Sequence, residues 1–424
     1  MPTDQPTDQP TDRTGARRPR VLIVVQNLSV PLDRRVWLEC QALVAAGHQV
    51  SVICPRDEGQ PPHRTLDGVR IHTYRPAPAR SGVAGYLVEF AYSWLRTAGL
   101  SFHVARHEGF DVLQACNPPD TYWLLGRLWR LLARKRFVFD HHDLNPEVYE
   151  ARFGRRGLLH RGLLALERAT FATADHVIST NESYREVATT RGRVPLEHTT
   201  IVRSAPDPDR MRREAPDPAL RHGREHLICY LGIMGPQDGV DRLLNAVDHL
   251  VHRMGRTDVH VGLMGFGDCL EDLRAQAHRQ GLDDYVTFTG KVGPAEIGRW
   301  LSAADLGVTP DPKNPFNDKS TMNKTLEYMA YELPVVGFDL TENARSAADA
   351  AVTVRTTGTP DDDAALARAI AELLDDPERR SRMGAIGRKR VEDSLRWSAQ
   401  EGPYVAVFER LAGKAPSRLR TVRG

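Results

Sequence analysis

Runs of apolar, mostly β-branched residues alternate with segments of helical periodicity along the first half of the chain. The run RVLIVVQ (20–26) has the composition of a buried parallel strand. Apolar side chains at helical spacing follow it, Gly47 ends that helix, and QVSVIC forms the next strand of a βαβ unit. Further strands are predicted at VRIHTYR, FDVLQA, RFVFD and DHVIST. The pattern predicts a doubly wound α/β domain over residues 20–205.

The same alternation restarts after a polar, proline-rich stretch, and residues 206–225 are predicted to be a linker. The strands that follow it are LICYLG, DVHVGLMG, YVTFTG, DLGVTP, PVVGFD and AAVTV. A second α/β domain is expected over residues 226–395, with a helix and a tail over 396–424. Residues 1–19 repeat Pro-Thr-Asp-Gln without an apolar core and are expected to be a disordered tail. A cleft between the two domains is the expected ligand site.

Composition narrows the class of protein. A length of 424 residues favours two domains, and a net charge of +2 disfavours nucleic acid as a partner. The five cysteines are scattered without a C-x-x-C pair, which indicates reduced thiols and argues against a zinc site or a disulfide framework. The sequence shows no signal peptide and no uncharged apolar stretch of about 20 residues. We therefore expect a cytoplasmic protein.

Glycines follow three predicted strands of the second domain, in YLGIMGPQDG, LMGFGD and FTGKVG. They include Gly232, Gly235, Gly265 and Gly290. Glycine after a strand lets backbone N–H groups approach a phosphate or a sugar ring closely. Tight turns produce the same residues, so each glycine alone is open to either interpretation.

The segment NDKSTMNKTLEYMA brings two cations and two hydroxyls to the start of a predicted helix. Ser320 or Thr321 is expected to cap this helix, whose free N–H groups and dipole then favour an anion. Lys319 and Lys324 add positive charge. The alternative is structural, with Lys324 and Glu327 as a surface i,i+3 pair worth a few tenths of a kcal/mol.

Titratable residues also gather in the first domain, directly after the predicted strand RFVFD. Asp140, His141, His142 and Asp143 stand at its carboxyl end, where ligands bind in α/β sheets. A metal site is the weaker interpretation, because neighbours in an extended segment point to opposite sides.

Three charged residues, Asp33, Arg34 and Arg35, stand in the predicted loop after the first strand. This segment is either a solvated loop or a partner for a phosphate or an acceptor, and the sequence leaves both open.

These segments, taken in order, resemble the family 4 retaining glycosyltransferases, whose GT-B fold has two Rossmann-like domains. The resemblance extends over residues 20–412 and rests on GHQVSVICP, FDHHDL, ADHVISTNES, DGVDRLLNA, YVTFTGKV, AADLGVTP and TLEYMAYELPVVGFD. It implies an α/β fold of two tandem Rossmann-like, doubly wound domains facing a central cleft, and a last helix that crosses back to the first domain. It also implies a UDP- or GDP-linked sugar as donor, a glycan or lipid-linked acceptor, retention of configuration, and no required metal or other cofactor.

The resemblance assigns roles to individual residues. Glu327 matches the acid that binds the donor ribose, Gly290 to Val292 match the segment beside the nucleobase, and His142 matches the active-site histidine. We expect His142, Asp143 and Lys324 to act in catalysis, and Asp33, Arg34 and Arg35 to lie on the acceptor side. The expected donor-binding residues are Gly232, Gly235, Gly265, Gly290, Lys291, Val292, Lys319, Ser320, Thr321, Asn323 and Glu327.

The chain departs from the family pattern at the diphosphate site. Lys319 stands where a second acid is usual, Ile233 and Asp238 stand where cations are usual, and Glu332 replaces a glycine. One explanation is that Lys319 and Lys324 replace the lost cations. The others are a catalytically silent donor-binding scaffold and, less favoured, a sugar-nucleotide epimerase.

Two segments of the first domain, 123–137 and 151–169, mix Trp, Phe or Leu with Arg at helical spacing. Such helices suit an anionic membrane surface, and the resemblance to enzymes with lipid-diphosphate acceptors favours peripheral contact with the inner face of the cell membrane. The alternative is an ordinary helix with a solvated basic face.

Overall fold

The computed structural model describes residues 18–77 and 82–412, which form two compact units by their internal contacts. The first unit comprises the described residues up to Pro146, Arg156–Arg203 and the part of the last helix from Gln400. The second comprises Glu147–Arg155 and Ser204–Ala399. Residues 1–17 and 413–424, and with them most of the two predicted tails, lie outside the described residues. The domain boundaries given above stay predictions.

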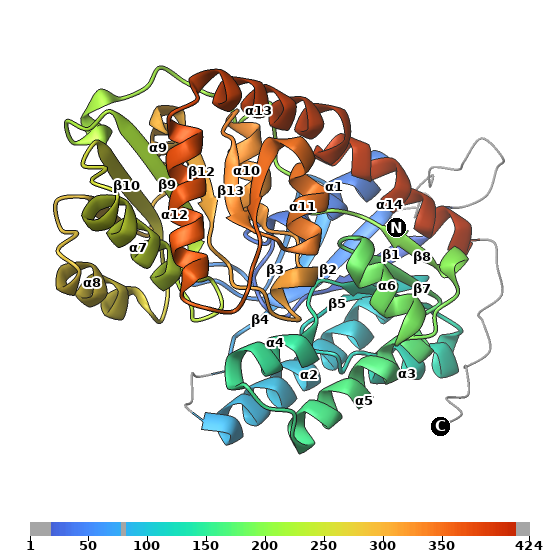
Figure 1. Cartoon of the computed structure of the whole chain (residues 1–424). Helices are drawn as coiled ribbons and strands as arrows, with labels where there is room; N and C mark the ends of the chain where they lie inside the picture. Colours follow the sequence, from blue (N-terminus) through green and yellow to red (C-terminus); the bar gives the residue numbers. More distant parts are fainter. Residues whose placement is uncertain (1–17, 78–81, 413–424) are drawn as a thin grey trace. The chain divides into compact units, whose positions relative to one another are not determined.

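The first unit is built on an eight-stranded sheet with the order β3-β4-β2-β1-β5-β6-β7-β8 (Figure 1). All neighbouring strands are parallel except β3, which runs antiparallel to β4 at the edge. The strands are β1 (Arg20–Val24), β2 (Gln49–Pro55), β3 (His63–Leu66), β4 (Val69–Tyr74), β5 (Val112–Cys116), β6 (Arg136–His141), β7 (His176–Ser179) and β8 (Thr199–Ile201). The helices are α1 (Arg34–Ala45), α2 (Gly82–His107), α3 (Trp123–Ala133), α4 (Asn145–Phe153), α5 (Leu158–Thr173), α6 (Glu182–Thr190), η1 (Leu196–His198) and α14 (Trp397–Ala412). The two units divide α4 at Pro146 and α14 at Gln400.

The second unit is built on a six-stranded, all-parallel sheet with the order β11-β10-β9-β12-β13-β14. Its strands are β9 (His226–Ile233), β10 (Val259–Phe266), β11 (Val286–Gly290), β12 (Leu306–Thr309), β13 (Val335–Phe338) and β14 (Ala351–Val354). Its helices are α7 (Val240–Asp248), α8 (Leu270–Arg279), α9 (Pro294–Ala303), α10 (Asn323–Ala330), α11 (Thr341–Ala347), α12 (Asp361–Leu374) and α13 (Pro377–Arg390). Shorter helical turns are η2 (Pro218–Arg221), η3 (His249–Arg253), η4 (Asn317–Lys319), η5 (Ala348–Ala350) and η6 (Val391–Leu395).

Side chains of β9 alternate between two apolar cores, one on each face of the second sheet. Ile228 and Tyr230 belong to the core formed with α7 and α12, and α7 packs directly against α12 (Figure 1). Leu227 and Cys229 belong to the core formed with α9 and α10 on the opposite face. A strand covered on both faces must be apolar throughout, which is why these strands are uninterrupted apolar runs in the sequence.

The prediction of an α/β fold with two Rossmann-like, doubly wound domains is confirmed. The strand order of the second sheet is the 3-2-1-4-5-6 order of a Rossmann fold, and the first sheet extends the same order at both edges. Two strands were not predicted. The edge strand β3 has the polar sequence HRTL, and β8 has only three residues, so neither carries the apolar run of a buried strand.

Glu332, the residue that replaces a glycine, ends α10 with a positive φ of 58°. The Leu333 N–H donates to Tyr328 O and the Glu332 N–H to Met329 O, a Schellman motif that strongly favours glycine at position 332. The left-handed region costs a residue with a Cβ about 1–2 kcal/mol, and the extra backbone entropy of glycine offsets about half of it. Glu332→Gly is therefore expected to raise the free energy of unfolding by up to about 1 kcal/mol, measured by urea denaturation. Gly223→Ala at φ 73°, where a Cβ meets open space, should shift the stability in the opposite direction.

Candidate functional site

The strand order of the second sheet reverses between β9 and β12. The carboxyl ends of parallel strands at such a reversal form a ready-made ligand crevice. The loop after β9 runs from Met234 to Gly239, and Pro310 and Asp311 follow β12. The two loops approach closely, because a Cβ on Gly239 would lie 2.2 Å from Pro310 O.

The glycines at this edge of the sheet are required for different structural reasons. A Cβ on Gly265 would lie 1.8 Å from Gly232 O, so crowding between β9 and β10 requires this glycine. A Cβ on Gly232 would lie 3.2 Å from Lys324 Cε, which places the lysine stem beside β9. Gly290 has a φ of 69° and open space around its missing Cβ, whereas a Cβ on Gly235 would meet the side chains of Gln237 and Asp238. Backbone packing therefore explains Gly265, and the positive φ of Gly290 explains a glycine at that position.

Lys324 is buried at this edge with two carboxylates. Its Nζ lies 2.7 Å from Asp311 Oδ1 and 4.0 Å from Asp238 Oδ1, and it stands 4.9 Å from the centre of the Tyr230 ring. Asp311 Oδ2 is buried and has no hydrogen-bond partner among the described residues. Lys324 is thus not half of a surface pair with Glu327, because its side chain is buried beside the two carboxylates.

The pKa values of Asp238 and Lys324 in this cluster are both raised. Burial raises the pKa of Asp238 to about 6, and Asp311 adds to the effect while Lys324 opposes it. Burial lowers the pKa of Lys324, but Asp311 and Asp238 outweigh burial, so the pKa is raised and the ammonium stays charged. Asp238 also accepts a hydrogen bond from the Gly235 N–H at 3.0 Å, which ties its carboxylate to the loop after β9.

The predicted helix cap is wrong. α10 begins at Asn323 with Met322 as its N-cap and no capping side chain. Ser320 instead donates its hydroxyl to Phe316 O at 2.8 Å, and its φ and ψ are extended. Thr321, the other predicted cap, is half-buried just before the helix. The hydroxyl of Ser320 thus closes the preceding η4 turn.

The remaining predicted donor-binding residues lie around the same edge of the second sheet. Lys319 Nζ lies 3.3 Å from Glu147 Oε1 within the second unit. Lys291 is exposed, with Nζ 5.2 Å from the centre of the Phe266 ring, and Val292 packs against the α9–α10 core. Asn323 is exposed on the first turn of α10, and Glu327 is half-buried one turn later.

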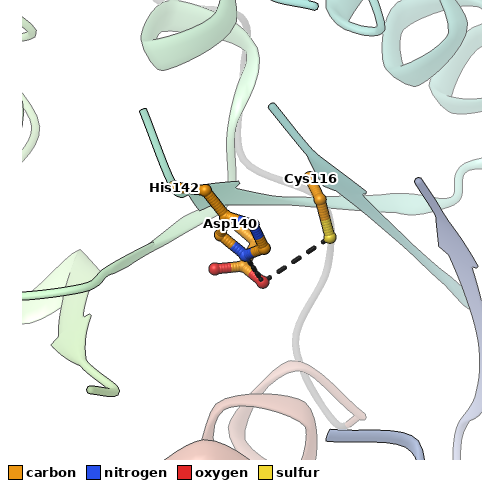
Figure 2. A group of neighbouring side chains, drawn as sticks. All are labelled: Cys116, Asp140 and His142. Carbon is orange, nitrogen blue, oxygen red and sulfur yellow. Dashed lines mark hydrogen bonds and ion pairs between the residues drawn. The ribbon is translucent and has the colours of Figure 1, made fainter. Parts of the chain in front are cut away.

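A second cluster lies in the first unit, where β5 and β6 end side by side. His142 Nε2 lies 2.7 Å from Asp140 Oδ2, and Cys116 Sγ lies 3.6 Å from the same oxygen. Figure 2 shows both contacts meeting at one carboxylate oxygen. Three ligand-type atoms this close could hold a metal ion, but Gln114 and Arg35 also bond to Asp140. These bonds occupy the carboxylate, so the group is better described as a hydrogen-bonded network.

Arg35 provides the positive charge of this network. Its guanidinium lies 3.1 Å from both Asp140 and Glu39, and its Nε lies 2.9 Å from His142 Nε2. The sequence placed Asp33, Arg34 and Arg35 in a loop, and this is wrong. Asp33 is the N-cap of α1 and accepts from the Val36 N–H, while both arginines lie in the first helical turn. Only Arg34 points to solvent, because Arg35 is held by two buried carboxylates.

The pKa values of the two buried carboxyl groups beside Arg35 shift in opposite directions. Burial raises the pKa of Asp140, but His142 and Arg35 outweigh it, and the pKa lies below its ordinary value. Burial and the Asp140 charge raise the pKa of Glu39 well above its ordinary value. Asp140 therefore carries the negative charge that faces His142.

The other two residues of the predicted first-domain group point elsewhere. His141 is buried among the rings of Phe139, Phe171 and Tyr184, and burial lowers its pKa to about 3. Burial also raises the pKa of Asp143, which is otherwise lowered by His142. The alternation of an extended segment thus sends Asp140 and His142 to one side and His141 to the other.

Asp311, Gln114 and Tyr404 contact these clusters and were not predicted as site residues. Asp311 follows β12 directly, and an acid after the strand at a sheet reversal is a signal that could have identified it. Gln114 is a fully buried amide in β5, and it donates to both Asp140 and Glu39. Tyr404 of α14 donates to Gln114 Oε1 at 2.8 Å, a contact between residues 290 positions apart that no local pattern shows.

Two Rossmann-like sheets in one chain, each with a polar cluster at its strand ends, are the architecture of the two-domain GT-B fold. Residues 32–205 match the family model described as glycosyl transferase 4-like domain, and residues 225–376 match that of glycosyl transferases group 1. The chain therefore belongs to the GT-B glycosyltransferases.

The chain is also similar to individual proteins of known name. A GDP-mannose-dependent alpha-(1-6)-phosphatidylinositol monomannoside mannosyltransferase of Mycobacterium tuberculosis is 32% identical over 206 residues, covering 45% of this chain and 50% of the relative. The chain thus matches about half the length of that relative. A glycogen synthase of the same species is 25% identical and covers 91% of this chain and 92% of its own. The structure of sucrose-phosphate synthase from Thermosynechococcus elongatus superposes with a TM-score of 0.74 at 19% identity, over 93% of this chain and 99% of its own.

Among the described residues, every helix is too short or too polar to cross a lipid bilayer.

Proposed function

We propose that this protein is a retaining glycosyltransferase that moves a sugar from a nucleotide-diphosphate sugar to a glycan or a lipid-linked acceptor. The observation that carries the proposal is the buried Lys324 at the reversal of the second sheet, beside Gly232 and the loop after β9. An ammonium group fixed at the crevice of a Rossmann-like sheet can stabilise the charge that develops on a leaving diphosphate. A similar mannosyltransferase is named as GDP-mannose-dependent, which supports a nucleotide sugar as donor.

The network of the first unit supports the proposed role of His142. Its Nε2 donates to Asp140 when it carries a proton and accepts from Arg35 when it does not, so in either state the imidazole has a fixed orientation at the end of β6. A group fixed in this way can bind a sugar hydroxyl in the reacting position. Asp143, proposed with His142, lies next to it, and its backbone N–H donates to Asn117.

Incubation with a panel of UDP- and GDP-linked sugars tests the proposal. A transferase hydrolyses its donor slowly when no acceptor is present, releasing nucleoside diphosphate and free sugar, and His142→Ala should reduce this release at least 100-fold. An epimerase would change the sugar without releasing the nucleotide, and a silent scaffold would bind a nucleotide sugar without changing it. Either of these two results would overturn the proposal.

The raised pKa of Asp238 predicts a pH-dependent affinity for the donor. One ammonium and two carboxylates face one another, so the cluster of Lys324, Asp311 and Asp238 is negative when Asp238 is ionised and neutral when it is protonated. The folded chain holds the proton more tightly than the unfolded chain, so ionisation of Asp238 costs stability as the pH rises from its ordinary value of 3.8 to about 6. The donor diphosphate is esterified at both ends and keeps its charge in this window. Donor affinity is therefore expected to rise several-fold as the pH falls from 7.5 to 5.5.

Isothermal titration with a nucleotide sugar at several pH values checks this expectation. Asp238→Asn keeps an oxygen that can accept from the Gly235 N–H but removes the charge. The variant should bind the donor tightly at pH 7.5 and lose the pH dependence. A variant that retains the pH dependence would show that another group titrates.

We further propose that the first unit contacts an anionic membrane through α3 and α5, which pack against each other. Leu131 and Leu158 are 79% and 85% exposed, and Leu132 and Leu159 are exposed beside them. Arg134 and Arg161 lie on the same two segments. Apolar side chains flanked by arginines suit a surface of anionic lipid. The chain should sediment with anionic vesicles at low salt and not with neutral ones, and Leu131→Asn with Leu158→Asn should abolish this, whereas Leu196→Asn should not.

A further inference from the structure

Four histidines gather at the outer edge of the first sheet, away from the strand ends that carry His142. His63 of β3 stands directly opposite His72 of β4 in the antiparallel register. His103 and His107 lie one turn apart on α2, and their rings are 4.3 Å apart. Neither the hairpin nor the helix contributes to the proposed transferase site.

The rings have the spacing of ligands that share one ion. The centre of the His63 ring lies 5.0 Å from that of His72 and 5.5 Å from that of His103, and the rings of His72 and His103 are 5.8 Å apart. Three imidazoles at tetrahedral angles, each with a metal–nitrogen distance of about 2.0–2.1 Å, have ring centres roughly 5 Å apart. In this structure the ligand nitrogens of the three histidines do not all lie within 4.8 Å of one another, so rotation of the side chains has to bring them to one ion.

Hydrogen-bond partners orient two of the rings for metal binding. His72 Nε2 lies 2.8 Å from Glu108 Oε1, and Glu108 in turn accepts from Ser51 at 2.5 Å. A proton on Nε2 leaves the lone pair on His72 Nδ1, which lies 2.9 Å from His63 Nδ1. His107 Nδ1 lies 2.9 Å from His103 O, which leaves its Nε2 as the ligand atom. Carboxylates and backbone carbonyls hold metal-binding histidines in this same way.

The surroundings fit a metal ion that enters from solvent. His72 is buried, whereas His63, His103 and His107 are exposed on one side of it. Arg70 lies 3.7 Å from Glu108 and balances the carboxylate that orients His72. Imidazole ligands suit zinc, copper and nickel, and zinc accepts a tetrahedral set without a preference from its d electrons.

We propose that His63, His72 and His103, with His107 as the fourth ligand, form a binding site for one divalent transition-metal ion such as Zn²⁺. The ion would tie the β3–β4 hairpin to the carboxyl-terminal end of α2. An exposed edge strand held in this way is clamped to the body of the first unit, so the site is structural and separate from sugar transfer.

Equilibrium dialysis of the full, untagged chain against micromolar Zn²⁺ tests the site. One zinc per chain is expected, with a rise of several degrees in the melting temperature. His103→Ala and His63→Ala replace exposed side chains, and each should weaken zinc binding at least tenfold. His278→Ala is the matched control, because His278 is an exposed helical histidine paired with Asp283. No bound zinc, or binding that survives both ligand substitutions, would overturn the proposal.

Cobalt distinguishes this site from the cluster of Cys116, Asp140 and His142. Co²⁺ bound only by histidines should give visible absorption without the near-ultraviolet band of a cobalt–thiolate bond. The signal should persist in Cys116→Ala and disappear in His103→Ala. The reverse result would place the metal in the Cys116 cluster and overturn the proposal. Failure of donor hydrolysis would leave these results unchanged, because the readout is metal binding alone.

Discussion

Arg35→Met is expected to lower the free energy of unfolding of the first unit by about 3–5 kcal/mol, as removal of one member of a buried ion pair usually does. The Arg35 guanidinium lies 3.1 Å from both Asp140 and Glu39, and both carboxyl groups are fully buried. Methionine fills much of the same space, but it leaves the Asp140 charge without its guanidinium partner. Because His142 is held from one side by Arg35, donor hydrolysis should also fall.

Arg34→Met is the matched control, because Arg34 precedes Arg35 in the same turn of α1 and points to solvent. Its stability should change by less than about 0.5 kcal/mol. Urea denaturation of both variants, followed by tryptophan fluorescence, measures the difference. Equal stability of the two variants would mean that the buried network contributes nothing to the fold.

Lys324→Met is expected to weaken binding of the nucleotide sugar by about 100-fold, the effect of losing a buried charge-assisted contact of about 3 kcal/mol. Lys319→Met should weaken it less, by about tenfold, because Lys319 is 35% exposed and water screens its charge. Titration calorimetry with the donor identified by the panel measures both effects. If neither substitution weakens donor binding, the two lysines do not replace the missing cations.

Loss of Lys324 also leaves the buried carboxylate of Asp311, which is 2% exposed, without its cation. The single variant is therefore expected to be less stable than the unchanged protein. The double variant Lys324→Met with Asp311→Asn removes both charges and should recover stability without recovering donor affinity. Lys313→Met is the control lysine, because Lys313 pairs with Asp339 at an exposed position of the same unit. Recovery of donor affinity in the double variant would show that Lys324 acts only on the fold.

The long apolar runs allowed most of the fold to be predicted. A strand of a parallel sheet is buried on both faces and is therefore mostly apolar. The apolar composition of β1, β6, β9 and β10 was enough to predict them as strands. No local pattern shows that β9 pairs with both β10 and β12. The general rule of right-handed crossovers nevertheless limits the strand orders that a Rossmann-like domain can adopt. The polar edge strand β3 carried no such signal.

The site was harder to predict, because the sequence gives residue types and not partners. The sequence left Lys324 as either a cation for an anion or half of a surface pair with Glu327, yet the residue is buried beside Asp311 and Asp238. Ser320 is a residue type that often caps helices, but the N-cap of α10 is Met322, and the Ser320 hydroxyl donates to Phe316 O. Asp140 and His142 were recognised as neighbours in sequence, whereas Arg35 and Gln114 reach them only through the order of β1, β5 and β6.

The contact between Tyr404 and Gln114 has a consequence for synthesis of the chain. Gln114 links Tyr404 to Asp140, so the network that holds His142 includes a residue close to the end of the described chain. On the ribosome, a nascent chain released as far as residue 399 contains every segment of the second unit but lacks the last helix of the first. Domains fold as units as they emerge. The unit translated later can thus be complete first, and the His142 network closes only when the final helix has been made.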